Sequence, residues 1–267
     1  MSATTAVTAR GGARTTPAGR LGALARAELT LLGRNKGTLF AAAVVPLIMP
    51  LSTRSATSGM DLKGNGLDSA TLALSAGIGF SLLFAVYTTI TSVFVARREE
   101  LVLKRLRTGE LRDPEILAGA ALPSLAIAVV QCLVLAVGCA VLLDAGAPQA
   151  IHLTVLGILA GLVLFTALAA VTSAFSRSTE SAQVMTMPLM FLSMLGSGLF
   201  IPLEVMPDKL ADVCELLPLT PVIKLVRGGW TGDLSAAGAL GALAVAVAWI
   251  VLAVFAGQRW FRWEPRR

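Results

Sequence analysis

Six long apolar stretches dominate this 267-residue sequence and limit what it can fold into. Most of them approach or exceed the roughly 20 residues that a helix needs to cross the hydrocarbon core of a bilayer. Charged residues make up 14% of the chain, whereas soluble domains carry about 25%. The sequence therefore predicts an all-α integral membrane protein with six transmembrane helices, at Thr38–Thr53, Ser69–Ala96, Ile116–Leu143, Ile151–Phe175, Gln183–Ile201 and Ala236–Gly257.

The basic residues indicate how these spans are oriented. Loops rich in Lys and Arg are retained in the cytoplasm. An N-terminus placed inside leaves all but five of the 22 Lys and Arg residues on the cytoplasmic side. We therefore expect both termini to be cytoplasmic, and anionic lipid head groups to be partners of the net charge of +6. Nucleic-acid binding is not expected, because no compact basic domain with interleaved aromatic residues is present.

Two segments precede the first predicted span. Residues 1–20 are rich in Thr, Ala and Arg, which predicts a disordered cytoplasmic tail, with a transit peptide as the alternative. In Leu21–Arg34 the apolar residues share one helical face and Arg26 and Thr30 take the other, which predicts an interfacial helix in the membrane plane. Glu28 lies in the middle of the apolar face, where a buried acid needs a cationic partner. Residues 21–267 are expected to form a single transmembrane domain.

A highly charged segment joins the second and third predicted spans. Residues 96–120, ARREELVLKRLRTGELRDPEILAGA, carry eleven charged side chains. Val102, Leu103 and Leu106 share one helical face, which predicts a short amphipathic cytoplasmic helix that ends by Gly109. Composition alone does not distinguish a docking helix from a loop that contacts only lipid head groups.

The connection Pro202–Asp233 is long and mixed in character. It alternates prolines with short apolar helical pieces. Irregular backbone at membrane depth is tolerated only where protein covers it or where it faces a water-filled cavity. We expect re-entrant or interfacial helices that form an external cap before the last span, with Gly228 and Gly229 closing its last turn.

Two stretches of this sequence resemble motifs of one transporter family. RREELVLKRLRTGELRDPEI, residues 97–116, resembles the cytoplasmic coupling segment of the type-2 family of ATP-binding-cassette (ABC) exporter permeases. LPLTPVIKLVRGG, Leu217–Gly229, resembles the external NPLTP…RG element of that family, with Leu217 where many members carry Asn. Within that family, the chain resembles the bacterial drug and antibiotic exporters, including the daunorubicin-resistance type.

The resemblance implies a permease subunit in a bacterial plasma membrane. Such a subunit pairs with a second copy of itself and with two ATPase subunits, and it exports a hydrophobic or amphipathic compound. The chain is expected to be no enzyme and to bind no cofactor or metal, because it lacks the G-x-x-x-x-G-K-[ST] motif, so that ATP and Mg²⁺ belong to the ATPase. The residues expected to couple to the ATPase are Glu28, Arg98, Glu100, Lys104, Arg105 and Gly109, and Glu28 is expected to pair with Arg98 or Arg105.

Two stripes of side chains are candidates for a substrate path. Aromatic and hydroxyl side chains in the second span follow i, i+4, i+7 and i+11 spacing, which predicts a shared face. Thioether side chains in the fifth span suit a surface that accepts varied apolar ligands. The family resemblance implies that these spans line a pathway between protomers, and helix packing or lipid contact is the alternative. The candidates are Phe80, Phe84, Tyr87, Thr91, Met187, Phe191 and Met194.

The interiors of the predicted spans contain no Asp, Glu, Lys, Arg or His. A membrane-embedded enzyme or a proton-coupled transporter needs ionisable groups at one depth, so both are disfavoured. A membrane scaffold that recruits a cytoplasmic partner through residues 97–115 remains the alternative function. Gln131, in the middle of the third span, is expected to hydrogen bond to a neighbouring helix.

Overall fold

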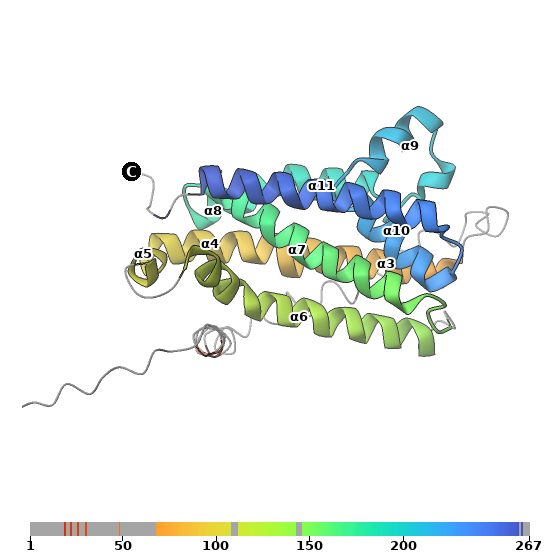
Figure 1. Ribbon diagram of the computed structural model, residues 1–267, viewed down its shortest axis with the longest axis horizontal. Helices are drawn as coiled ribbons and strands as arrows, with labels where there is room; N and C mark the ends of the chain where they lie inside the picture. The colour runs from red at the N-terminus through yellow and green to blue at the C-terminus, as the bar shows by residue number, and fades with distance from the viewer. Residues whose placement is uncertain are drawn as a thin grey trace, which may run out of the picture.

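The computed structural model describes residues 68–107, 112–142, 146–261 and 263, and the single positions Gly19, Gly22, Arg26, Thr30 and Ile48. In this part of the chain the regular elements are helices, and the long ones run side by side along one axis (Figure 1). Their bounds are α3 (Ser69–Ser81), η2 (Leu82–Thr88), α4 (Thr89–Glu99), α5 (Val102–Arg107), α6 (Asp113–Leu142), α7 (Ile151–Phe175), α8 (Thr179–Gly196), η3 (Leu203–Val205), α9 (Asp208–Glu215), α10 (Thr220–Thr231) and α11 (Ala236–Trp260). The prediction of an all-α integral membrane protein is confirmed.

Four helices are long and apolar enough to cross a membrane, at Ser69–Glu99, Asp113–Val141, Ile151–Phe175 and Ala236–Trp260. They correspond to the second, third, fourth and sixth predicted spans. The fifth predicted span corresponds to α8, which has 18 residues but carries polar side chains such as Glu180 and Gln183 in its first two turns. The count of six spans stays a prediction, since most of the first span and the tail at 1–20 lie outside the described residues.

Two single positions bear on the predicted interfacial helix. Arg26 and Thr30 are both helical and exposed. The Thr30 hydroxyl donates to the carbonyl of Arg26 at 2.7 Å, one helical turn away. Both residues belong to the face predicted to be polar, so the two positions agree with a helix in Leu21–Arg34.

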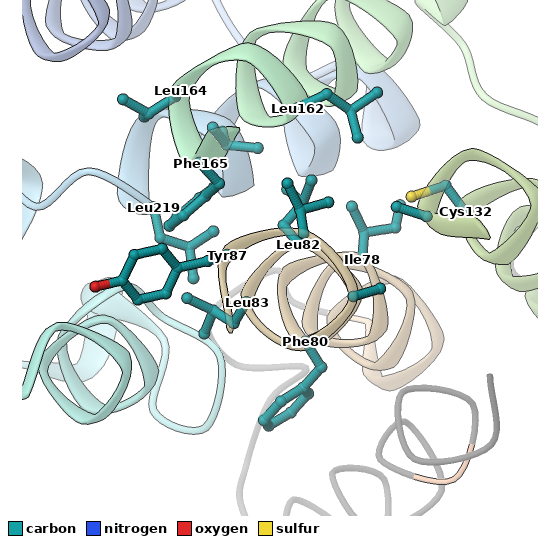
Figure 2. Packing of buried hydrophobic residues seen from close by; sticks show 14 of the residues in the cluster. Ile78, Phe80, Leu82, Leu83, Tyr87, Cys132, Leu162, Leu164, Phe165 and Leu219 are labelled. Carbon is teal, nitrogen blue, oxygen red and sulfur yellow. The ribbon is translucent and has the colours of Figure 1, made fainter. Parts of the chain in front are cut away.

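The second crossing, formed by α3, η2 and α4, lies at the centre of the bundle. Every residue from Ala70 to Ser81 is buried. Ser81 donates its hydroxyl proton to Oε1 of Gln131 on α6 at 2.6 Å, which confirms the predicted polar contact between these helices. Figure 2 shows apolar side chains of this crossing packed against α7 and α6, including Leu82 near Leu162 and Ile78 near Cys132.

The π-helix η2 changes the direction in which side chains of this crossing point. The hydroxyls of Thr88 and Thr89 both donate to the carbonyl of Phe84 at 2.8 Å, and such side-chain donors compete with the regular backbone ladder. A π-helix winds more loosely than an α-helix, so residues before and after it lose their α-helical alignment. Phe80 and Tyr87 accordingly point to different sides of the crossing (Figure 2), and the expectation that they share one face is wrong.

Helices α7 and α10 pack closely because glycines face the contact. A Cβ atom on Gly157 would lie 2.9 Å from Cβ of Leu225, and one on Gly161 would lie 3.0 Å from Cγ1 of Val222. Small residues spaced four apart let helix backbones approach in membranes. Helix α10 is therefore held deep against the bundle rather than on its surface.

The predicted re-entrant cap consists of η3, α9 and α10. Its chain reaches the middle of α11, where Nε1 of Trp249 donates to the carbonyl of Leu216 at 2.8 Å. From there α10 runs back to the loop before α7, where the amide of Ala150 donates to the carbonyl of Gly229 at 2.8 Å. The prediction that Gly228 and Gly229 close the last turn is wrong. Both lie inside α10, and Gly232, at φ 78°, ends that helix because glycine enters the left-handed region freely.

Candidate functional site

A sharp elbow joins α4 to the short helix α5, at the end of the bundle where α11 also ends (Figure 1). Leu101 lies between the two helices with φ 60°, and within the described residues it is the one non-glycine with positive φ. A bulky residue in the left-handed region is uncommon and stores backbone strain. The side chain of Leu103 is fully buried and anchors α5 against the bundle. The elbow is therefore a fixed turn, and the predicted amphipathic helix is confirmed at Val102–Arg107.

Arg98, in the last turn of α4, is 1% exposed and is the largest fully buried side chain among the described residues. Its Nη1 donates to the carbonyl of Ser173 at 2.9 Å, and its Nη2 donates to the carbonyl of Ser176 at 2.5 Å. These carbonyls flank the C-terminus of α7 at Phe175. The negative end of a helix dipole and its unpaired carbonyls favour a cation at this place. One guanidinium thus fastens the elbow to the end of α7.

The other expected coupling residues are placed as follows. Glu100 is exposed and accepts a hydrogen bond from Nη1 of Arg97 at 3.0 Å, and Arg105 is exposed on α5. Lys104 belongs to α5, but its side chain is not among those described, and Glu28 and Gly109 lie outside the described residues. Exposed charges of both signs therefore gather at the elbow, beside the buried Arg98.

A second charged region lies at the cap end of the bundle. A cavity of about 350 Å³ is lined there by charged side chains, including Asp68, Lys224, Arg227 and Asp233. Arg227 on α10 forms an ion pair with Glu204 of η3, and Lys224 forms one with Glu215 of α9 at 2.5 Å. These pairs tie the parts of the cap together. Within the described residues no cluster of three His, Cys, Asp or Glu side chains could hold a metal ion.

The elbow and the cap therefore stand at opposite ends of one bundle of apolar helices, and the NPLTP-like element, Leu217–Gly229, begins just before α10 and continues into it (Figure 1). A model of the ABC-2 type transporter family matches residues 20–230, which is more than half of the chain. The chain belongs to the ABC-2 type transporter family. It is a multi-pass membrane protein and a permease component of an ABC transporter, and an ABC ATPase is its implied partner. No curated protein matches the chain.

In this ABC-2 domain the candidate path residues of the second crossing lie mainly inside the protomer. Phe80, Tyr87 and Thr91 are buried, and Phe84 is partly buried. Tyr87 packs edge to face on Phe165, with ring centroids 6.1 Å apart. Their contacts in this structure are packing contacts between helices, so a role in the substrate path stays a proposal.

The candidate path residues of α8 are placed differently in the ABC-2 domain. Met187 is 46% exposed and Phe191 is 52% exposed, whereas Met194 packs partly against the core. The two exposed side chains lie four residues apart and share a face of α8. Of the predicted path residues, Met187 and Phe191 are therefore the ones exposed on the surface of the described protomer.

An apolar groove between α6 and α7 was not found by sequence reasoning. It encloses about 410 Å³ and is lined by side chains such as Val129, Leu133, Ile158 and Trp230. No sequence motif predicts this groove, because the residues that line it are apolar like the other residues of the spans. The buried contacts of Arg98 were also missed in part, since the sequence does not show that α7 ends beside α4.

Proposed function

We propose that this chain is the permease subunit of an ABC exporter that moves a hydrophobic or amphipathic small compound, of the drug or antibiotic type, out of a bacterial cell. ATP and Mg²⁺ are bound by two copies of a separate ATPase, and two copies of this chain form the pathway. The chain lies in the plasma membrane with both termini in the cytoplasm. Glu28, Glu100, Lys104, Arg105 and Gly109 belong to the region that the ATPase engages.

The observation that carries this proposal is the elbow between α4 and α5. Its turn is set by the left-handed Leu101 and its helix is anchored by the buried Leu103. It presents Glu100 and Arg105 outward on a rigid base, and Arg97, whose side chain is 18% exposed, pairs with Glu100. A push on such a base moves the attached helices, whereas a flexible loop would absorb it. Charged rims of this kind also set partner choice through electrostatic complementarity.

The apolar surfaces of the bundle support an apolar cargo. Met187 and Phe191 are exposed on α8, and methionine adapts its shape to varied ligands. The bacterial plasma membrane and the outward direction rest on the resemblance of residues 97–116 and 217–229 to drug and antibiotic exporters.

The test is reconstitution of the permease with its ATPase in proteoliposomes. A panel of fluorescent amphipathic compounds, daunorubicin among them, is followed for ATP-dependent movement across the bilayer. The control is an ATPase whose P-loop lysine is replaced, because that lysine contacts the phosphates. Transport that needs both ATP and the intact P-loop supports the proposal. An assembled complex that moves none of the compounds would favour a scaffold that recruits its partner through residues 97–115.

A further inference from the structure

Arg98 is buried inside the helix bundle, where a cation raises the free energy of the folded state unless acceptors pair with it. It lies one helical turn before α5, yet its guanidinium points into the bundle and is 1% exposed. Removing a charge from water costs free energy that only close, well-oriented acceptors offset. The two carbonyls of Ser173 and Ser176 are such acceptors, and the planar fork of arginine reaches both at once.

The acceptors belong to the turn that leads from α7 into α8. Ser173 lies in the last turn of α7, and Ser176 is its C-cap. Only Arg177 and Ser178 separate this cap from the start of α8 at Thr179. A displacement of the Arg98 side chain is therefore applied at the junction of two long helices.

Hydrogen bonds make the connection between α7 and α8 stiff, so a displacement of the end of α7 also displaces the start of α8. Ser178 and Ser181 form a reciprocal capping box, in which Oγ of Ser178 accepts from the amide of Ser181 at 3.2 Å and Oγ of Ser181 accepts from the amide of Ser178 at 2.8 Å. The amide of Arg177 also donates to Oγ of Ser181, at 2.8 Å. These amide hydrogen bonds fasten the connection between α7 and α8 to the first turn of α8.

We propose that Arg98 is a positioning residue that carries movement of the elbow to α7 and α8, and does not itself contact the ATPase. The inference rests on the proposed function, because it needs an ATPase that moves α5. It assigns separate tasks to neighbouring residues of the elbow. Glu100 and Arg105 are exposed and meet the partner, whereas Arg98 faces inward and moves α8, the helix that carries Met187 and Phe191.

The test compares Arg98→Gln and Arg98→Lys with Arg177→Gln in the complex with the ATPase. Gln removes the charge, and Lys keeps the charge but lacks the planar fork that spans two carbonyls. Arg177 is the matched control, because it lies in the same turn with an exposed side chain.

Movement of α8 is measured by cysteine labelling. A single cysteine replaces Leu192, which is 55% exposed on α8, in a chain whose buried Cys132, Cys139 and Cys214 are changed to alanine. The readouts are ATPase co-purification, ATP hydrolysis, and the change in maleimide labelling at position 192 when ATP is added.

The expected result is that both Arg98 variants bind the ATPase and hydrolyse ATP, but lose at least about fivefold of the ATP-dependent labelling change, the lower end of usual coupling between sites. Arg177→Gln keeps the full change. If Arg98→Gln does not fold, Arg98→Lys and Ser178→Ala test the same inference. Ser178→Ala weakens the connection between α7 and α8 and leaves Arg98 in place, so it should reduce the labelling change as well. A full labelling change in the Arg98 variants, or none in the unaltered complex, would overturn the inference alone. Failure of the unaltered chain to bind an ATPase would instead overturn the proposed function.

Discussion

The hydroxyl groups of Tyr87 and Thr172 lie 2.9 Å apart and join the second crossing to α7 inside the bundle. Tyr87 is 1% exposed, so its hydroxyl has little access to solvent or to a passing ligand in this structure. Tyr87→Phe should lower the free energy of unfolding by about 1 kcal/mol, because one buried hydrogen bond is lost and Thr172 is left without this partner. Chemical unfolding in detergent measures the change. Unaltered stability together with an altered substrate profile would place Tyr87 on the path instead.

The exposed residues of α8 should behave in the opposite way. Met187→Ala and Phe191→Ala remove side chains that are about half exposed, so each should change stability by less than about 0.5 kcal/mol. Each should nevertheless change which amphipathic compounds are transported. Leu252→Ala, on the exposed face of α11, is the matched control and should leave the profile unchanged. Equal loss of transport for every compound, together with loss of expression, would show that these side chains only pack.

Gly229 should tolerate no side chain. A Cβ atom there would lie 2.6 Å from the backbone nitrogen of Thr154 and 3.0 Å from the carbonyl oxygen of Ala150, and backbone atoms cannot turn aside. Gly229→Ala should therefore destabilise the protein by about 1–3 kcal/mol, as overpacking does. Gly241→Ala is the control, since no atom lies within 4 Å of its added Cβ and alanine favours the helix. Thermal melting of both variants decides, and equal melting temperatures would contradict the close packing of α10 on α7.

The ion pair of Arg227 and Glu204 should hold the cap only weakly. The Glu204 side chain is 42% exposed, so water screens the pair and its loss should cost less than about 1 kcal/mol. Glu204→Arg should loosen the cap and increase proteolysis between η3 and α9, because it places two cations side by side. The reversed pair, Glu204→Arg with Arg227→Glu, should restore part of the protection. Equal cleavage in the single and double variants would argue against the pair.

The long helices are predictable from the sequence because hydropathy over about 20 residues is a strong signal. The predicted fourth span, Ile151–Phe175, has the bounds that α7 has in the structure. The predicted fifth span, Gln183–Ile201, begins later than α8 does, because the capping box at Ser178 starts α8 with polar residues of low hydropathy. The π-helix η2 was not predicted, since it depends on how two threonine hydroxyls compete for one carbonyl.

The candidate site was predictable only in part. The charge pattern of residues 96–120 indicates a helix at the surface, and α5 confirms it. The direction of a single side chain depends on tertiary packing, so the sequence did not show that Arg98 turns inward to α7. The pairing of Glu28 with Arg98 or Arg105 stays a prediction, because Glu28 lies outside the described residues. A charge exchange between Glu28 and either arginine, followed by ATPase co-purification, tests it.

In the proposed function, the elbow between α4 and α5 contacts the ATPase and receives its force. A photo-reactive amino acid at position 100 tests this contact, with position 204 on the cap at the other end of the bundle as the control, because both native side chains are exposed glutamates. We expect an adduct between position 100 and the ATPase that depends on the assembled complex, and none from position 204. An active complex that gives no adduct at position 100, or one that gives it at position 204, would show that the ATPase does not engage the elbow.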